Sequence, residues 1–86
     1  MFKYEFTSKS LKQLRKLDRN IQFKIINKLD EICSHEKLSA NANIEHLTNF
    51  KIGEYRTRIG NYRIIFDLEN DTLVILKVGH RKDVYK

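Results

Sequence analysis

Five cationic side chains stand close together in the last third of the chain, and their types and spacing suit chemistry on a phosphate. They are Arg56, Arg58, Arg63, Lys77 and Arg81. A guanidinium presents its N–H donors in a planar fork that binds two phosphate oxygens at once, whereas an ammonium acts as a point charge. We therefore expect these residues to face an anionic polymer, and RNA fits that expectation best.

The first turn in this region fixes which of its residues are neighbours. Gly60-Asn61 stands between two runs that alternate apolar and polar residues, a pattern typical of a two-residue hairpin loop. This loop predicts three cross-strand pairs: Ile59 with Tyr62, Arg58 with Arg63, and Thr57 with Ile64.

The second turn, around Glu69-Asn70-Asp71, has room for two or three loop residues, and burial decides between them. A three-residue loop pairs Leu68 with Thr72. It places the apolar residues of both strands on one core-facing side: Tyr62, Ile64, Phe66, Leu68, Val74, Leu76 and Val78. A slip of one residue would turn every side chain to the opposite face, so we predict the three-residue loop.

The same register gathers the cations on the side of the sheet that faces away from the core. Arg58, Arg63 and Lys77 line up across three strands; Arg56 joins them, and so does Arg81 if the last strand continues. Like charges directly opposite one another destabilise a sheet by a few tenths of a kcal/mol to about 1 kcal/mol per pair. For any single residue, an ordinary solvated face is the preferred interpretation. For the set we favour a phosphate-binding face, because arginine predominates and no carboxylate is interleaved among the first three.

The first half of the chain predicts a strand and two helices. Residues 2–7 alternate apolar and polar side chains, and Thr7 or Ser8 then offers a hydroxyl to cap a helix. Asp18 can cap the second helix. The two helices carry apolar stripes formed by Leu11, Leu14 and Leu17 and by Ile21, Ile25, Ile26, Leu29, Ile32 and Cys33.

These elements predict an α+β fold in one domain, residues 1–86. We expect an N-terminal strand, a two-helix antiparallel hairpin and then an antiparallel three-strand meander. Residues 35–51 show weaker periodicity, and we expect them to form a connection that contacts the core through Ile44, Leu47 and Phe50.

Composition narrows the classes of function. The chain has 86 residues and a net charge of +6, which permits a nucleic-acid partner without requiring one. No apolar run is long enough to span a membrane, and the opening residues lack a secretion signal, so a cytosolic location is the default expectation. Cys33 is the single cysteine, and the three histidines are scattered. We therefore expect a buried structural thiol, no metal site and no cofactor.

At the level of motifs, residues 55–85, YRTRIGNYRIIFDLENDTLVILKVGHRKDVY, resemble the C-terminal part of the RelE/ParE superfamily of type II toxins. The shared features are a Y-R-x-R-x-G-x-Y-R hairpin, an acidic turn and a V-x-H-R-x-D-x-Y ending. The resemblance extends over essentially the whole chain. It implies the RelE-like α+β fold and an antitoxin protein as partner. The RelE branch of this superfamily cleaves mRNA, usually on the ribosome, whereas the ParE branch inhibits DNA gyrase on a similar fold.

The resemblance to the RelE branch also implies a role for each matched residue. Arg56 and Arg58 would hold the RNA backbone and favour the ionised 2′-hydroxyl. Arg63 would neutralise the scissile phosphate, and Arg81 would stabilise or protonate the departing 5′ oxygen. Tyr85 would orient or stack on a nucleotide. The strand register, not the resemblance, adds Lys77 beside Arg58 as a substrate-binding residue.

The proton acceptor stays open at this point. Arginine is a poor base because its pKa stays above about 12, and His80 has a suitable unperturbed pKa of about 6.5. However, simple alternation turns His80 toward the core, where a histidine satisfied at a strand end is an equal alternative. The leading hypothesis is a ribosome-dependent, metal-independent mRNA endonuclease that uses the 2′-hydroxyl of its substrate. The alternatives are a ParE-type gyrase inhibitor without nuclease activity and a toxin fold that serves only to bind an antitoxin.

Overall fold

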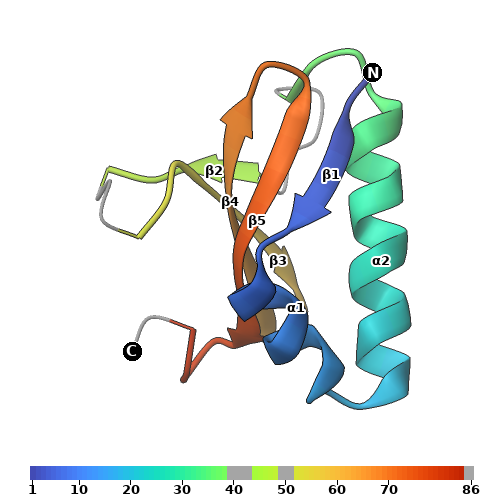
Figure 1. Cartoon of the computed structure of the whole chain (residues 1–86), viewed down its shortest axis with the longest axis vertical. Coiled ribbons are helices and arrows are strands. Elements are labelled where there is room, and N and C mark those ends of the chain that lie inside the picture. The colour runs from blue at the N-terminus through green and yellow to red at the C-terminus, as the bar shows by residue number, and fades with distance from the viewer. Residues whose placement is uncertain (39–43, 49–51, 85–86) are drawn as a thin grey trace.

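In the part of the chain that the structure describes, five strands form one sheet, and two helices cover one of its faces (Figure 1). The computed structural model describes residues 1–38, 44–48 and 52–84. The elements, in chain order, are β1 (Lys3–Phe6), α1 (Ser8–Arg15), α2 (Arg19–Ser34), β2 (Ile44–His46), β3 (Tyr55–Ile59), β4 (Tyr62–Glu69) and β5 (Thr72–His80).

Both predicted helices are confirmed, and a side-chain cap explains where the first of them begins. The Thr7 hydroxyl oxygen accepts a hydrogen bond from the backbone N–H of Ser10 at 3.1 Å, which caps α1. Asp18 is the residue before α2, but its side chain makes no capping hydrogen bond. The apolar stripe of α2 is buried as expected through Ile25, Leu29, Ile32 and Cys33. Cys33 is therefore a buried structural thiol.

The strand order is β1-β5-β4-β3-β2, so the predicted meander of β3, β4 and β5 forms the middle of a larger sheet. β1 extends the sheet in parallel to β5, and β2 extends it antiparallel to β3. The strand β2 was not predicted, because three residues are too few to show a period. Its first residue, Ile44, packs against the core as expected. Phe50 lies outside the described residues.

The turn between β4 and β5 differs from the prediction. Glu69 pairs with Thr72 and Leu68 with Leu73, so Asn70-Asp71 is a two-residue loop and the predicted Leu68–Thr72 pair is wrong. Asn70 adopts a φ of 56°, a left-handed conformation that asparagine tolerates better than most residues and that tight hairpin loops require. The conformational preference of Asn70 therefore explains the length of this loop better than the burial pattern on which the prediction relied.

A β-bulge at Leu76 restores the register that the shorter turn would have lost. Phe66 pairs with Ile75, but Ile65 pairs with Lys77, so β5 contains one extra residue at this point. The core-facing residues of β5 are consequently Leu73, Ile75 and Val78, not Val74, Leu76 and Val78. Beyond the bulge the register is two residues from the predicted one, and a shift of two leaves every side chain on its expected face.

Gly53 closes part of the face of the sheet that carries no helix. This glycine is buried, with a φ of 151°, and a Cβ built on it would lie 2.6 Å from Ile65 Cγ2. Ile65 points away from the helices yet is completely buried. The chain around Gly53 thus covers Ile65, whereas Arg58, farther along β3, is exposed.

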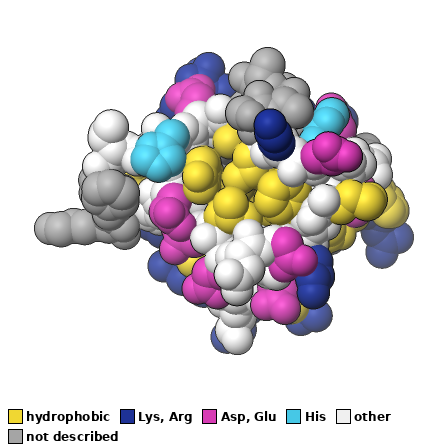
Figure 2. All heavy atoms as spheres, turned by 90° about the horizontal axis from the view of Figure 1, so that it is seen from above, with side chains coloured by type: hydrophobic (Ala, Val, Ile, Leu, Met, Phe, Trp, Pro, Cys, Tyr) yellow, Lys and Arg dark blue, Asp and Glu magenta, His cyan; other side chains and the backbone are white. Residues whose placement is uncertain are grey.

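The surface is not uniformly basic. Figure 2 shows the molecule from the end that carries the N-terminus: hydrophobic side chains gather at the centre, and acidic and basic side chains are interspersed around them. The positive net charge is therefore not spread evenly over the surface, and a cluster of cations is a property of one particular face.

Candidate functional site

Four basic side chains of β3, β4 and β5 lie on the helix-free face of the sheet, and we call the surface that they form the cationic face: Arg56, Arg58, Arg63 and Lys77. They occupy two neighbouring rows of the ladder. Arg56 and Lys77 flank Ile65 in one row, and Arg58 lies directly opposite Arg63 in the next. The predicted alignment of Arg63 with Lys77 is wrong, because the bulge places Gly79 opposite Arg63 and moves Lys77 one row away.

Glu45 brings a carboxylate into the cationic face from β2, and sequence reasoning missed it. Glu45 pairs with Arg56 across the strands. Its Oε2 forms an ion pair with Arg56 Nη2, and its Oε1 lies 3.0 Å from Arg58 Nη2. The hydrogen bond from Arg56 and the charges of Arg56, Arg58 and Arg63 hold the pKa of Glu45 below its usual value, against a smaller opposing effect of burial. The expectation that no carboxylate interrupts the first three arginines is therefore wrong in space, although it holds along β3 and β4.

The two arginines that share Glu45 differ in their surroundings. The side chain of Arg56 is 20% exposed, and that of Arg58 is 55% exposed. Arg56 is accordingly built into the sheet, whereas Arg58 stands at the solvent boundary, where it can meet a ligand. This difference suits a site in which one guanidinium is fixed and another adapts.

Arg63 is tied to the first hairpin loop. Its Nη1 donates to the carbonyl oxygens of Gly60 at 2.8 Å and Tyr62 at 2.9 Å. Both partners are neutral, so these bonds orient the guanidinium without neutralising it. The arginine that faces Arg58 thus keeps its full charge in a fixed position, which is the arrangement required for electrostatic stabilisation of an anion.

Arg81 lies at the same end of the sheet as Arg63, but in a turn and not in a strand. β5 ends at His80, so the strand does not continue through Arg81; this residue lies in an exposed turn. Its backbone N–H donates to the carbonyl oxygen of Asn61 at 2.7 Å, which keeps the turn beside the Gly60-Asn61 loop. Tyr85 lies outside the described residues. The preceding Val84 is 4% exposed, an anchor that sequence reasoning did not identify.

His80 lies on the opposite side of the sheet from the cationic face, as alternation predicts. It pairs with Tyr62, and the two rings meet edge to face with centroids 5.5 Å apart. Both line a pocket of about 450 Å³ beside α1, together with Gln13 and Leu17. The imidazole Nδ1 accepts a hydrogen bond from the backbone N–H of Lys82 at 3.1 Å. Its surroundings are those of a histidine satisfied at a strand end.

The remaining acids near the site serve the backbone. Asp67 Oδ1 accepts from the N–H of Glu54 at 2.8 Å, and Glu54 Oε1 accepts from the N–H of Leu68 at 3.2 Å. Glu54 is half-buried, and its side chain binds the backbone of β4. These two carboxylates therefore hold the chain around Gly53, which we call the covering segment, against the sheet. They do not form an acid–base pair.

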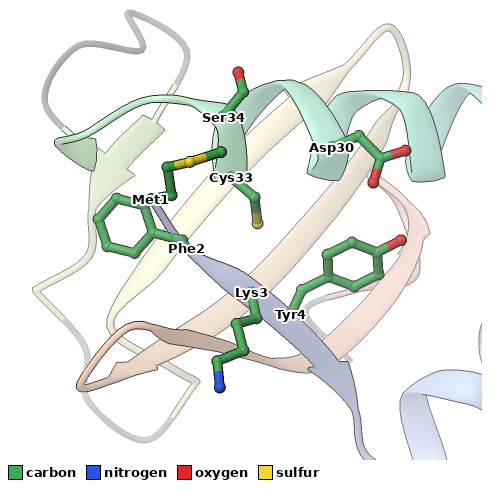
Figure 3. Close-up of a pocket in the computed structure, with 7 residues that line it drawn as sticks. All are labelled: Met1, Phe2, Lys3, Tyr4, Asp30, Cys33 and Ser34. Carbon is green, nitrogen blue, oxygen red and sulfur yellow. The ribbon is translucent and has the colours of Figure 1, made fainter.

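Another depression lies between β1 and α2, and its chemistry is different. It measures about 330 Å³ and includes Tyr4, Asp30 and Cys33 (Figure 3). Burial, followed by the nearby Asp30 carboxylate, raises the pKa of both the Tyr4 hydroxyl and the Cys33 thiol. Both groups are thus held in their neutral forms, so this depression contains no activated nucleophile.

Two further features bear on the class of protein. Within residues 1–38, 44–48 and 52–84, no group of three or more histidine, cysteine or acidic side chains is placed to hold a metal ion. No helix in these ranges has the length and apolar character needed to cross a membrane.

The structure is that of a small α+β protein with a cationic face on its sheet, and comparison places it in a family. Residues 4–85 match the family described as "ParE toxin of type II toxin-antitoxin system, parDE". The chain therefore belongs to this family of toxins, within the RelE/ParE superfamily. It is also 48% identical over 31 residues to Toxin RelE3 of Methanocaldococcus jannaschii. That match covers 36% of this chain and 35% of the relative, so the chain spans about a third of the curated relative's length.

Solved structures of RelE proteins share the fold. The RelB–RelE antitoxin–toxin complex from Methanococcus jannaschii matches with 28% identity and a TM-score of 0.73, over 93% of each chain. The RelBE2 toxin–antitoxin complex from Mycobacterium tuberculosis matches with 23% identity and a TM-score of 0.75, over 93% of this chain and 98% of that one. The isolated RelE toxin of E. coli matches with 22% identity and a TM-score of 0.73, over 99% and 92%. The predicted RelE-like fold is thus confirmed.

Proposed function

We propose that this toxin is a ribosome-dependent mRNA endonuclease that acts by metal-independent transesterification. The observation that supports it best is the arrangement of Arg56, Arg58 and Arg63 on one solvent-accessible sheet face. Three guanidinium groups can bind a phosphodiester and stabilise the charge that develops on it. None of them can serve as a nucleophile, whereas RNA carries one of its own in the 2′-hydroxyl next to each phosphate.

The reaction that fits is attack of the RNA's own 2′-hydroxyl on the adjacent phosphorus. The new O–P bond closes a 2′,3′-cyclic phosphate, and the bond to the 5′ oxygen breaks. The proton lost from the 2′-hydroxyl is balanced by a proton gained at the departing 5′ oxygen, which leaves a 5′-hydroxyl. The enzyme supplies alignment and charge stabilisation, which can contribute large rate factors. DNA lacks the attacking hydroxyl and would not be cut.

Each residue of the site then has a place in this reaction. Arg56 and Arg58 hold the RNA backbone, with Lys77 as a further cation for the strand. Arg63, oriented by two carbonyl oxygens, neutralises the scissile phosphate. Arg81, at the same end of the sheet, and Tyr85 are assigned to the departing oxygen and to the nucleotide, as the resemblance to RelE toxins implies. His80 is not included, because its ring lies on the helix side.

An antitoxin protein is the partner we propose, and the cytoplasm, where ribosomes translate, is the location. The solved relatives include RelB–RelE complexes in which a toxin of this fold is bound to its antitoxin. An acidic partner suits a chain with a net charge of +6. Co-purification with the product of the neighbouring gene tests this part, and the absence of binding or neutralisation by that product would contradict it.

Primer extension on mRNA bound in a translating ribosome tests the nuclease proposal. With purified protein and excess ribosomes, we expect discrete breaks in the A site and their loss in Arg63→Ala. Removing one well-placed donor to the transition state lowers a rate by a factor on the order of 10² or more. Arg19→Ala, an exposed arginine at the start of α2, is the matched control and should cleave like the wild type. Melting curves must show that Arg63→Ala folds.

A ParE-type gyrase inhibitor is the second candidate, and the description of the matching family favours it. In that case the cationic face would dock on a protein or DNA surface, and Arg63 would have no special role. The ribosome assay would then show intact message, and a gyrase supercoiling assay would show inhibition. The opposite pair of results would exclude this candidate.

A further inference from the structure

Glu45 holds Arg56 and Arg58 in the way that a phosphate would. Each of its two carboxylate oxygens contacts one of the two guanidinium groups. A phosphodiester carries two non-bridging oxygens on one phosphorus, as a carboxylate carries two on one carbon, so the same pair of arginines fits either group. We propose that Glu45 occupies the phosphate site of the substrate-free protein and is displaced when the RNA backbone binds. This inference rests on the proposed function, because that function supplies the phosphate.

The exposure of the ion pairs makes the exchange feasible. The side chain of Glu45 is 43% exposed, and that of Arg58 is 55% exposed. The Glu45–Arg58 ion pair is accessible to water and is therefore weak, and Glu45 is itself exposed enough to leave Arg56, whose side chain is 20% exposed. An RNA strand brings several phosphates and gains the entropy of released counterions, so it competes effectively with a single carboxylate. A small monovalent anion has no such advantage.

The folded sheet also has a reason to keep this carboxylate. Arg58 lies directly opposite Arg63, and like charges in that position repel each other across the ladder. Glu45 lies within the field of all three arginines and offsets their repulsion while no substrate is bound. The residue therefore stabilises the free protein and at the same time weakens its affinity for phosphate. Short or singly charged anions are thereby excluded in favour of a polyanion.

Binding of a 2′-O-methyl oligoribonucleotide, measured by fluorescence anisotropy, tests the proposal without cleavage, because this probe has no 2′-hydroxyl to attack. We expect Glu45→Gln to bind about threefold to tenfold more tightly than the wild type. The slope of log K against log salt should change little, because the phosphate contacts the same two arginines in both complexes once Glu45 is displaced. Glu69→Gln makes the same change of charge in an exposed residue at the far end of β4 and should change the affinity little.

A double-mutant cycle shows whether Glu45 acts through the two arginines. The gain from Glu45→Gln should disappear in the Arg56→Gln/Arg58→Gln background. If Glu45→Gln binds the probe no more tightly than the wild type, the proposal is wrong. The proposal is equally wrong if the gain in affinity persists in the Arg56→Gln/Arg58→Gln background, or if Glu69→Gln produces the same gain. Either result would show a general effect of charge.

A titration of the wild-type protein with the same 2′-O-methyl oligoribonucleotide, followed by NMR, needs no variant. The Arg58 side-chain Nε–H signal and the Glu45 side-chain carboxyl signal should shift together at one saturating concentration. A shift of the arginine without the carboxylate would contradict the exchange. These binding measurements are independent of the ribosome assay, so a failure of the nuclease proposal is distinguishable from a failure of this one.

Discussion

Tyr62 and His80 face each other on the helix side of the sheet, with ring centroids 5.5 Å apart and ring planes at 80°. The neighbouring cross-strand pair is Arg63 with Gly79, and the side chain of Arg63 points to the other side of the sheet. His80 is thus separated from the cationic face by the sheet itself, and its Nδ1 is engaged by the backbone of Lys82. A base must reach the proton that it removes, and this imidazole does not face the cations.

His80→Ala should therefore cleave ribosome-bound mRNA at a rate within about threefold of the wild type under single-turnover conditions, since a general base contributes on the order of 10² or more. The measurement is the single-turnover rate, with Arg63→Ala as the inactive reference. A loss of tenfold or more in a folded His80→Ala variant would restore the histidine as the proton acceptor.

Substitutions of Arg56 and Arg58 should differ in their effect on stability but have the same effect on oligonucleotide binding. Arg58→Gln removes a mostly exposed side chain, so we expect a change in the free energy of unfolding of less than about 0.5 kcal/mol. Arg56→Gln removes a largely buried partner of Glu45 and should cost about 1–3 kcal/mol. Both variants should reduce the salt slope of oligonucleotide binding by about 0.7. Urea unfolding and anisotropy measure the two quantities.

An equal loss of stability in both variants would contradict the difference in burial. An unchanged salt slope in Arg58→Gln would show that this side chain does not contact the backbone of the bound strand. Arg15→Gln, an exposed arginine at the end of α1, provides the matched control for the loss of one positive charge.

The first hairpin was predictable because its turn is specified locally. Gly60 adopts a φ of 57°, and the pairs that it implies, including Arg58 with Arg63, are all present. The second turn is specified locally as well, by Asn70, but the prediction relied on burial and assumed an unbroken strand. The bulge at Leu76 has no strong local signal in the sequence, since the residue is an ordinary strand former.

The face was nevertheless predicted correctly for the four cations that lie in strands, Arg56, Arg58, Arg63 and Lys77, because the shorter loop and the bulge together shift the register of β5 by two residues. Glu45 was missed for a different reason. It belongs to a strand of three residues, and its contact with Arg56 spans eleven positions of sequence. Only the pairing of β2 with β3 brings the carboxylate to the arginines, and no pattern within residues 44–46 predicts that pairing.

The pH dependence of stability should report on Glu45. Arg56 and the neighbouring arginines lower the pKa of its carboxyl in the folded state, so it contributes stability above its unfolded pKa of about 4.3. That contribution is lost as the pH falls through the lowered folded pKa. The wild type should therefore melt at a higher temperature than Glu45→Gln at neutral pH, and the two melting curves should converge on acidification. A difference that is constant with pH, or equal to that of Glu69→Gln, would rule out this linkage.

Gly53 provides the sharpest test of how the helix-free face is closed. A Cβ at this position would lie 2.6 Å from Ile65 Cγ2 and 3.1 Å from Leu76 Cδ1, and both of these side chains belong to the sheet. Gly53→Ala should therefore force the covering segment away from β4 and cost about 1–3 kcal/mol, the usual range for overpacking, in addition to the strain of an alanine at a φ of 151°. Gly60→Ala has no atom within 4 Å of the added carbon, so it should cost only the left-handed conformation, about 1 kcal/mol.

Both glycines have a positive φ, so urea unfolding of the two variants must be combined with hydrogen exchange to separate close packing from backbone strain. A larger loss for Gly53→Ala, together with faster hydrogen exchange of the Glu54 and Leu68 amides that the covering segment protects, would confirm the close approach over Ile65. An equal loss in the two variants would show that the conformation of the glycine alone matters. Because Ile65 separates Arg56 from Lys77 in their row, displacement of this segment should also weaken oligonucleotide binding in Gly53→Ala.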